Sequence, residues 1–261
     1  MRLKYFFIAL ILSCPVWWGV NVFAKKTEGY IFSFISQNQQ IFNAQLNSAL
    51  ENTVRKYDLG ELDIKAKSAA SILVLPDGSE AFLYKKNIDE SLPIASLTKL
   101  MAADVVLENF DVSQKIKIEK TIAEDGVEKG LKKGESFFMK DLLYAALVES
   151  NNSAIQALSE IIGQENFVAL MNMEAKYLGM KKTNFINPTG LDPDEKSKKL
   201  EKINQSNVKD LIKLSEHIVK NQEISRMIST ESFDLHDSDG KLHHKAMTTD
   251  EFLESGVSFG E

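Results

Sequence analysis

Apolar residues between positions 97 and 219 recur mostly at helical spacing, with polar residues between them. This pattern predicts four amphipathic helices, because one face of each would be apolar and could pack on a core. Gly163 and Gly179 are expected to end the second and third helices, and Asn207, with Asp210 three residues later, to cap the fourth. The expected inward positions are Leu97, Leu100, Met101 and Val105; Ala154, Leu158, Ile161 and Ile162; Phe167, Leu170, Met171, Ala175 and Leu178; and Val208, Leu211, Ile212, Ser215, Ile218 and Val219.

Three further apolar stretches complete the expected elements. Residues 139–148 are apolar nearly all round, which indicates a helix enclosed on several sides. The shorter runs 69–75 and 81–84 flank a Pro-Asp-Gly-Ser turn and predict a β-hairpin. A hairpin alone is not stable in water, so we expect further strands to complete a larger antiparallel sheet.

The N-terminus has the pattern of an export signal. Two basic residues precede an apolar run over 5–24, and two lysines follow it. Val22 and Ala24 are small enough for a signal peptidase to cut after Ala24. The run is also close to the roughly 20 residues that span a bilayer, so an uncleaved membrane anchor remains open. Residues 1–24 are therefore interpreted as a signal peptide or anchor, and 25–65 as a spacer helix or stalk; the chain is expected in the periplasm or on the outer face of the cell membrane.

Composition narrows the classes of partner. The net charge of -6 is spread over mixed lysine and glutamate runs such as 195–202, and no arginine cluster or aromatic-basic alternation is present. The adjacent histidines His243 and His244 lie in a polar stretch without neighbouring ligand residues in the sequence. We therefore expect no nucleic-acid partner, no metal and no cofactor. The single cysteine, Cys14, lies within the leader, so a cleaved product would have no disulfide.

Candidate nucleophilic chemistry begins at Ser96. Lys99 follows three residues later at the start of a predicted helix, so the two side chains share one helical face. A serine hydroxyl needs a nearby base to take its proton, and a lysine amine serves as that base once it is neutral. The pattern Ser-x-x-Lys alone is weak, since it recurs at Ser206 and Lys209. A helix cap is the simpler interpretation of Ser96 by itself.

A second polar cluster makes acyl transfer the better interpretation. Ser150, Asn151 and Asn152 follow directly on the apolar stretch 139–148, where polar groups would be costly without partners. A hydroxyl at Ser150 could relay a proton to a leaving amine. The amide of Asn152 could hold both a lysine and a substrate carbonyl.

Three segments together resemble a known family. They are IASLTKLM at 94–101, DLLY at 141–144 leading into SNNSA at 150–154, and FINPTGLD at 185–192. They resemble the D-alanyl-D-alanine carboxypeptidases of the low-molecular-weight penicillin-binding proteins, over roughly residues 66–228 and in the family's order. The resemblance implies an α+β, β-lactamase/D,D-peptidase-like (penicillin-recognising) fold, with an antiparallel sheet and a helical subdomain.

The resemblance also implies the site residues and ligands. Ser96 would form the acyl-enzyme, Lys99 would be the acylation base, Ser150 would pass the proton to the departing D-alanine, and Asn152 would bind the substrate amide. The substrate would be the stem peptide of peptidoglycan. β-Lactams would acylate the same serine and act as inhibitors.

One family motif, Lys-Thr-Gly on a strand facing the nucleophile, is missing from the sequence. Lys182 and Thr183 are followed by Asn184 rather than glycine. No lysine in the sequence is followed by Thr-Gly. Loss of one oxyanion donor typically lowers the rate by about 100 to 1000-fold. We therefore expect a catalytic domain over 66–261 that is incomplete at its C-terminus, lacks the C-terminal strands and has weak or no activity, as in a truncated product.

Other functions remain open at this point. A D,D-endopeptidase or a serine β-lactamase would share the serine and lysine geometry. A protein of another class, a noncatalytic membrane-tethered protein that binds cell wall or β-lactam, would fit the missing motif. Labelling by a fluorescent penicillin that depends on Ser96 would separate this last alternative from the enzymes.

Overall fold

The computed structural model describes residues 64–74, 80–121, 130–192 and 203–254. The predicted leader and all but the end of the predicted spacer lie outside these residues. Within them, no helix is both long enough and apolar enough to cross a membrane. The chain forms two compact units, one of which includes residues 70–85, while the other includes residues 67–69 and 86–261.

The predicted hairpin is confirmed as two paired strands. Strand β1 (Ala69–Val74) pairs with β2 (Glu80–Lys86). The predicted turn between them falls outside the described residues. In the described parts of the chain no third strand joins this pair, so the larger sheet that the sequence led us to expect is not observed there.

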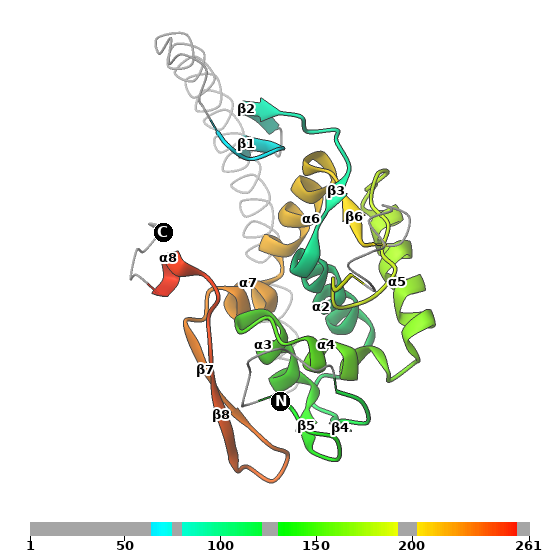
Figure 1. The fold of residues 1–261 in the computed structure, drawn as a ribbon, viewed down its shortest axis with the longest axis vertical. Helices are drawn as coiled ribbons and strands as arrows, with labels where there is room; N and C mark the ends of the chain where they lie inside the picture. Colours follow the sequence, from blue (N-terminus) through cyan, green and yellow to red (C-terminus); the bar gives the residue numbers. More distant parts are fainter. Residues whose placement is uncertain (1–63, 75–79, 122–129, 193–202, 255–261) are drawn as a thin grey trace, which may run out of the picture. The chain divides into compact units, whose positions relative to one another are not determined.

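The predicted helices form the second unit (Figure 1). A 3₁₀ turn, η1 (Ala95–Leu97), leads into the first of them. Among the described residues, the five predicted helices are α2 (Thr98–Asn109), α3 (Met139–Val148), α4 (Asn152–Ser159), α5 (Gln164–Tyr177) and α6 (Val208–Lys220). Two further helices, α7 (Gln222–Ile228) and the short α8 (Glu251–Glu254), were not predicted from the sequence. Asn207 caps α6 as predicted, with its side-chain oxygen accepting from the Asp210 N–H at 2.8 Å.

Helix α3 lies at the centre of the core, as its uninterrupted apolar character predicts. It packs against α2, α4, α7 and β7 (Figure 1). Its buried residues are Met139, Leu142, Leu143, Ala145, Ala146 and Val148. Because this helix is enclosed, the polar residues at its C-terminal end are held between buried elements rather than in a free loop.

Four of the expected inward residues are exposed instead, one of them Ser215 in α6. Leu97 is 48% exposed, Ile161 is 38% exposed and Val219 is 64% exposed. Leu97 belongs to the 3₁₀ turn before α2, and Ile161 lies beyond the last residue of α4, so neither has the direction that a continued helix would give it. Val219 is in the last turn of α6, where its neighbour Ile218 is the buried residue.

Three short antiparallel pairs complete the second unit. Strand β3 (Leu92–Pro93) pairs with β6 (Gln205–Ser206), β4 (Lys115–Lys117) with β5 (Ser136–Phe138), and β7 (Ser232–His236) with β8 (Leu242–Met247). The β3–β6 pair matters most for function. It brings the segment before Ser96 against residue 204, and the Ile94 N–H donates to the Asn204 carbonyl at 3.3 Å.

Candidate active site

The Ser-x-x-Lys segment lies where the chain enters α2. Ala95 has a positive φ of 43°, and the 3₁₀ turn that follows leaves the Ser96 side chain exposed. Lys99 lies in the first turn of α2 and is only 2% exposed. Its Nζ donates to Ser96 Oγ at 2.9 Å. An accessible hydroxyl thus contacts a buried amine, and burial favours the neutral form of an amine.

The same amine joins three separate segments of the chain. Besides Ser96, Lys99 Nζ donates to Ser150 Oγ at 3.2 Å and to the Thr189 carbonyl at 3.1 Å. These bonds match the three N–H donors of an ammonium group. When the amine is neutral, its lone pair can accept a proton from one of the two hydroxyls. The arrangement therefore links two serine side chains through one nitrogen.

Ser150 is held between two helices. It follows α3 with a positive φ of 60°, which is uncommon for a residue other than glycine. The next residue, Asn151, caps α4 by accepting from the Ala154 N–H at 2.9 Å, and its own N–H donates to the Ala145 carbonyl at 3.2 Å. Asn152 is half-buried and is the first residue of α4, two positions beyond Ser150. The two helix ends therefore fix the position of Ser150 between them.

A turn over residues 187–190 supplies the third side of the site. Asn187 Oδ1 accepts from the Thr189 N–H at 3.1 Å and from the Gly190 N–H at 2.7 Å. Gly190 has φ of 84°, and a Cβ placed on it would lie 2.0 Å from the Ala95 carbonyl oxygen. The turn can lie against the nucleophile segment only because this position is glycine. That close approach places the Thr189 carbonyl within reach of Lys99.

Comparison with known proteins explains this arrangement. The sequence model of a family described as D-alanyl-D-alanine carboxypeptidase matches residues 55–251. The chain belongs to this family. A D-alanyl-D-alanine endopeptidase of Pseudomonas aeruginosa is 38% identical over 129 residues, 48% of this chain and 42% of the relative. The D-alanyl-D-alanine carboxypeptidase DacF of Bacillus subtilis is 33% identical over 178 residues, 65% of this chain and 43% of the relative.

The chain thus spans less than half the length of these two relatives. Solved structures confirm the predicted fold class. Penicillin-binding protein D2 of Listeria monocytogenes, in its ampicillin-bound form, is 29% identical with a TM-score of 0.61, over 75% of this chain and 77% of that one. A D-alanyl-D-alanine carboxypeptidase from Mycobacterium tuberculosis is 25% identical with a TM-score of 0.65, over 75% of this chain and 71% of that one. The chain has the α+β fold of the penicillin-binding D,D-peptidases.

Asn204 is a site residue of this family member that the sequence analysis missed. It is 3% exposed, and its Nδ2 donates to Thr98 Oγ1 and to the Asn187 carbonyl, both at 2.9 Å. Its Oδ1 accepts from the Ile186 N–H at 2.7 Å. One buried amide thus ties the start of α2 to the 187–190 turn. No motif surrounds Asn204, so only its burial within the fold reveals this role.

The two adjacent histidines also have partners, contrary to the interpretation from sequence. His244 Nε2 lies 2.9 Å from Glu149 Oε2, and His243 Nε2 lies 3.3 Å from Glu135 Oε2. The two Nδ1 atoms lie 2.6 Å apart. Strand β8 brings His244 to Glu149 at the C-terminal end of α3, a contact that the sequence alone does not show.

This histidine network touches the second serine's segment. Glu149 precedes Ser150, and its other oxygen accepts from Asn151 Nδ2 at 2.8 Å. We expect His244→Leu to lower the free energy of unfolding by about 1 to 3 kcal/mol, because Glu149 would keep a partly buried charge without its partner. Urea unfolding measures this change, and Lys245→Leu on the exposed face of β8 is the control.

The double variant His244→Leu with Glu149→Leu tests the cause. Its loss of unfolding free energy should be smaller than the sum of the losses in the two single variants, because the unpaired charge of Glu149 is then absent. Strict additivity would show that the two side chains do not support each other.

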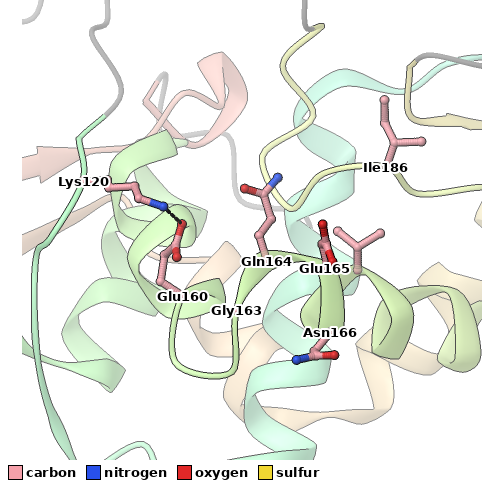
Figure 2. Close-up of a pocket in the computed structure, with 8 residues that line it drawn as sticks. Lys120, Glu160, Gly163, Gln164, Glu165, Asn166 and Ile186 are labelled. Atoms are coloured by element: carbon pink, nitrogen blue, oxygen red, sulfur yellow. Dashed lines mark hydrogen bonds and ion pairs between the residues drawn. The ribbon is translucent and has the colours of Figure 1, made fainter.

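The structure also has a polar hollow of about 710 Å³ that does not include the serines or Lys99 (Figure 2). It lies around the N-terminal turn of α5, with Gln164, Glu165 and Asn166 on that turn, and Ile186 also lines it. Lys120 Nζ lies 3.1 Å from Glu160 Oε1 there. Because this hollow has no nucleophile with a partner base, the reaction chemistry is assigned to the Ser96 site.

Proposed function

We propose that the chain is a serine-type D,D-peptidase that cleaves the terminal D-Ala-D-Ala bond of peptidoglycan stem peptides through an acyl-enzyme on Ser96. The observation that carries this proposal is the position of Lys99 Nζ, which is buried and within hydrogen-bond distance of both Ser96 Oγ and Ser150 Oγ. A nitrogen between two hydroxyls can move a proton from an attacking group to a leaving group.

The proposed reaction has two halves. In the first, neutral Lys99 takes the proton of Ser96 as Oγ attacks the penultimate D-Ala carbonyl, and the C–N bond then breaks. Ser150 passes the proton to the departing amine and is reprotonated by Lys99. In the second half, water attacks the ester and Ser96 Oγ recovers its proton. Asn152 would bind the substrate amide, and the Ser96 N–H would stabilise the developing oxyanion.

We further propose that the chain acts outside the cytoplasmic membrane, with residues 1–24 as signal peptide or anchor. The support is the charge and hydropathy pattern of that segment together with the substrate, since peptidoglycan lies on the outer side of the membrane. β-Lactams are the proposed inhibitors, because a strained cyclic amide would acylate the same serine.

Labelling with a fluorescent penicillin tests the proposal on the 261-residue chain. We expect covalent label on the wild type and none on Ser96→Ala. The matched control is Ser206→Ala, because Ser206 and Lys209 repeat the same spacing without a second serine in their hydrogen-bond set. Incubation should extend over hours, so that slow acylation is also detected. Absence of label on the wild type, or equal label on Ser96→Ala, would refute the acyl-enzyme.

Endopeptidase action is the second candidate, because the relative at 38% identity is named an endopeptidase. The two activities differ in products. A carboxypeptidase releases free D-alanine from a pentapeptide, whereas an endopeptidase converts crosslinked dimers to monomers. Mass analysis of muropeptides after incubation with wild type and Ser96→Ala distinguishes them.

A further inference from the structure

Three helices bring a histidine and two acids together in a cluster that takes no part in the proposed reaction. Asp104 lies on α2, Glu174 on α5 and His217 on α6. One side-chain oxygen or nitrogen of each lies within 4.8 Å of the others. His217 Nε2 and Asp104 Oδ1 are the nearest pair, at 3.1 Å. The cluster therefore offers one imidazole nitrogen and two carboxylates to a single point.

Asp104 is a buried carboxylate with a partner on only one of its two oxygens. Its residue is fully buried, and its Oδ2 has no hydrogen-bond partner among the described residues. Burial raises the pKa of this carboxyl, while His217 opposes the rise and the charge of Glu174 adds to it. A buried carboxylate that is only partly paired is costly, and such groups are commonly neutralised by a partner or a metal ion.

The donor set fits zinc. Zinc binds imidazole nitrogen and carboxylate oxygen at about 2.0 to 2.2 Å, which places neighbouring ligands of a tetrahedral site about 3.3 Å apart. The Asp104 and His217 atoms already lie at nearly this separation. Glu174 is half-buried on the neighbouring helix, and its long side chain can approach by rotation.

We propose that Asp104, Glu174 and His217 bind one Zn²⁺ ion, with water in the fourth position. Bound there, the ion would brace α2, which carries Lys99, against α5 and α6. Those two helices hold the segment that leads to the 187–190 turn. Asn172 of α5 donates to the Phe185 carbonyl at 2.8 Å, and Asp210 of α6 accepts from the Lys182 N–H at 2.6 Å. The proposed role of the ion is to hold these helices together, and the site lies apart from the reacting serines.

Zinc binding to the 261-residue chain tests the proposal directly. The protein is stripped with a chelator, and the bound metal is measured after dialysis against ZnCl₂. We expect one zinc per chain, lost in Glu174→Gln and in His217→Gln. Glu165→Gln, on the same helix but outside the cluster, is the matched control and should bind as the wild type does.

Thermal unfolding provides a second measurement. With zinc at about a hundred times its Kd, the melting temperature should rise by roughly 5 to 10 °C in the wild type and Glu165→Gln, and not in the other two variants. Circular dichroism without metal shows whether each variant folds. The proposal is overturned if the stripped wild type takes up no zinc, or if folded Glu174→Gln binds zinc as tightly as the wild type. Co²⁺ is an independent probe, since its visible absorption should be that of a tetrahedral site with nitrogen and oxygen ligands.

Discussion

Replacing Lys99 with methionine is expected to lower the rate of acylation by a fluorescent penicillin by about 10² to 10⁴-fold, the usual contribution of a positioned base. Lys99 Nζ is the nitrogen within hydrogen-bond distance of both Ser96 and Ser150, and methionine fills a similar volume without a proton acceptor of comparable strength. The chain should remain folded, because methionine fills the buried space of the lysine side chain and leaves no charge without a partner. We expect the free energy of unfolding to change by less than about 2 kcal/mol.

The control for this variant is Lys209→Met, which changes the lysine of the other Ser-x-x-Lys pattern. Lys209 is exposed and lies 3.8 Å from Asp89, so its loss should leave both acylation and unfolding nearly unchanged. Rates of labelling and urea unfolding are measured on both variants. If Lys99→Met acylates at the wild-type rate while folded, Lys99 is not the base.

Gly190→Ala is expected to destabilise the chain by about 2 to 5 kcal/mol and to reduce acylation sharply. Two costs add: a side chain at a φ of 84°, and a Cβ only 2.0 Å from the Ala95 carbonyl oxygen. The 187–190 turn must then move away from the nucleophile segment. Lys99 would lose the Thr189 carbonyl as an acceptor, so the amine would no longer be held between the serines.

Gly240→Ala separates these two costs. Gly240 has nearly the same φ, 83°, but a Cβ there would meet nothing within 4 Å. It should therefore lose only the conformational part, about 1 to 2 kcal/mol, and keep wild-type acylation. Chemical unfolding and labelling rates compare the two variants. Equal losses of stability in both variants would show that the close approach of Gly190 to Ala95 does not contribute to the cost of the substitution.

Local patterns in the sequence predicted the helices well, because helical periodicity and caps depend on neighbours a few residues away. Asn207 caps α6 as expected, and α3 is enclosed as its apolar composition requires. The same local rules failed for Leu97 and Ile161, which lie in a 3₁₀ turn and just beyond a helix end. A hydrophobic pattern alone does not show where a helix starts or stops to within one turn.

The candidate site was only partly accessible to the same reasoning. The spacing of Ser96 and Lys99 places them on one helical face, so their contact follows from sequence. The polar cluster at Ser150 was conspicuous because it follows an apolar helix. Its approach to Lys99, 51 residues away along the chain, required the packing of α2 against α3 and α4.

The sequence by itself determined the family, the helical segments and the identity of the candidate nucleophile, since these depend on residue type and short spacing. Only the tertiary structure decided which distant groups complete the site. Asn204, the Thr189 carbonyl, the Glu149–His244 pair and the cluster of Asp104, Glu174 and His217 have no shared local pattern. Their partners lie tens of residues away, and the packing of the helices and the short strand pairs brings them within bonding distance.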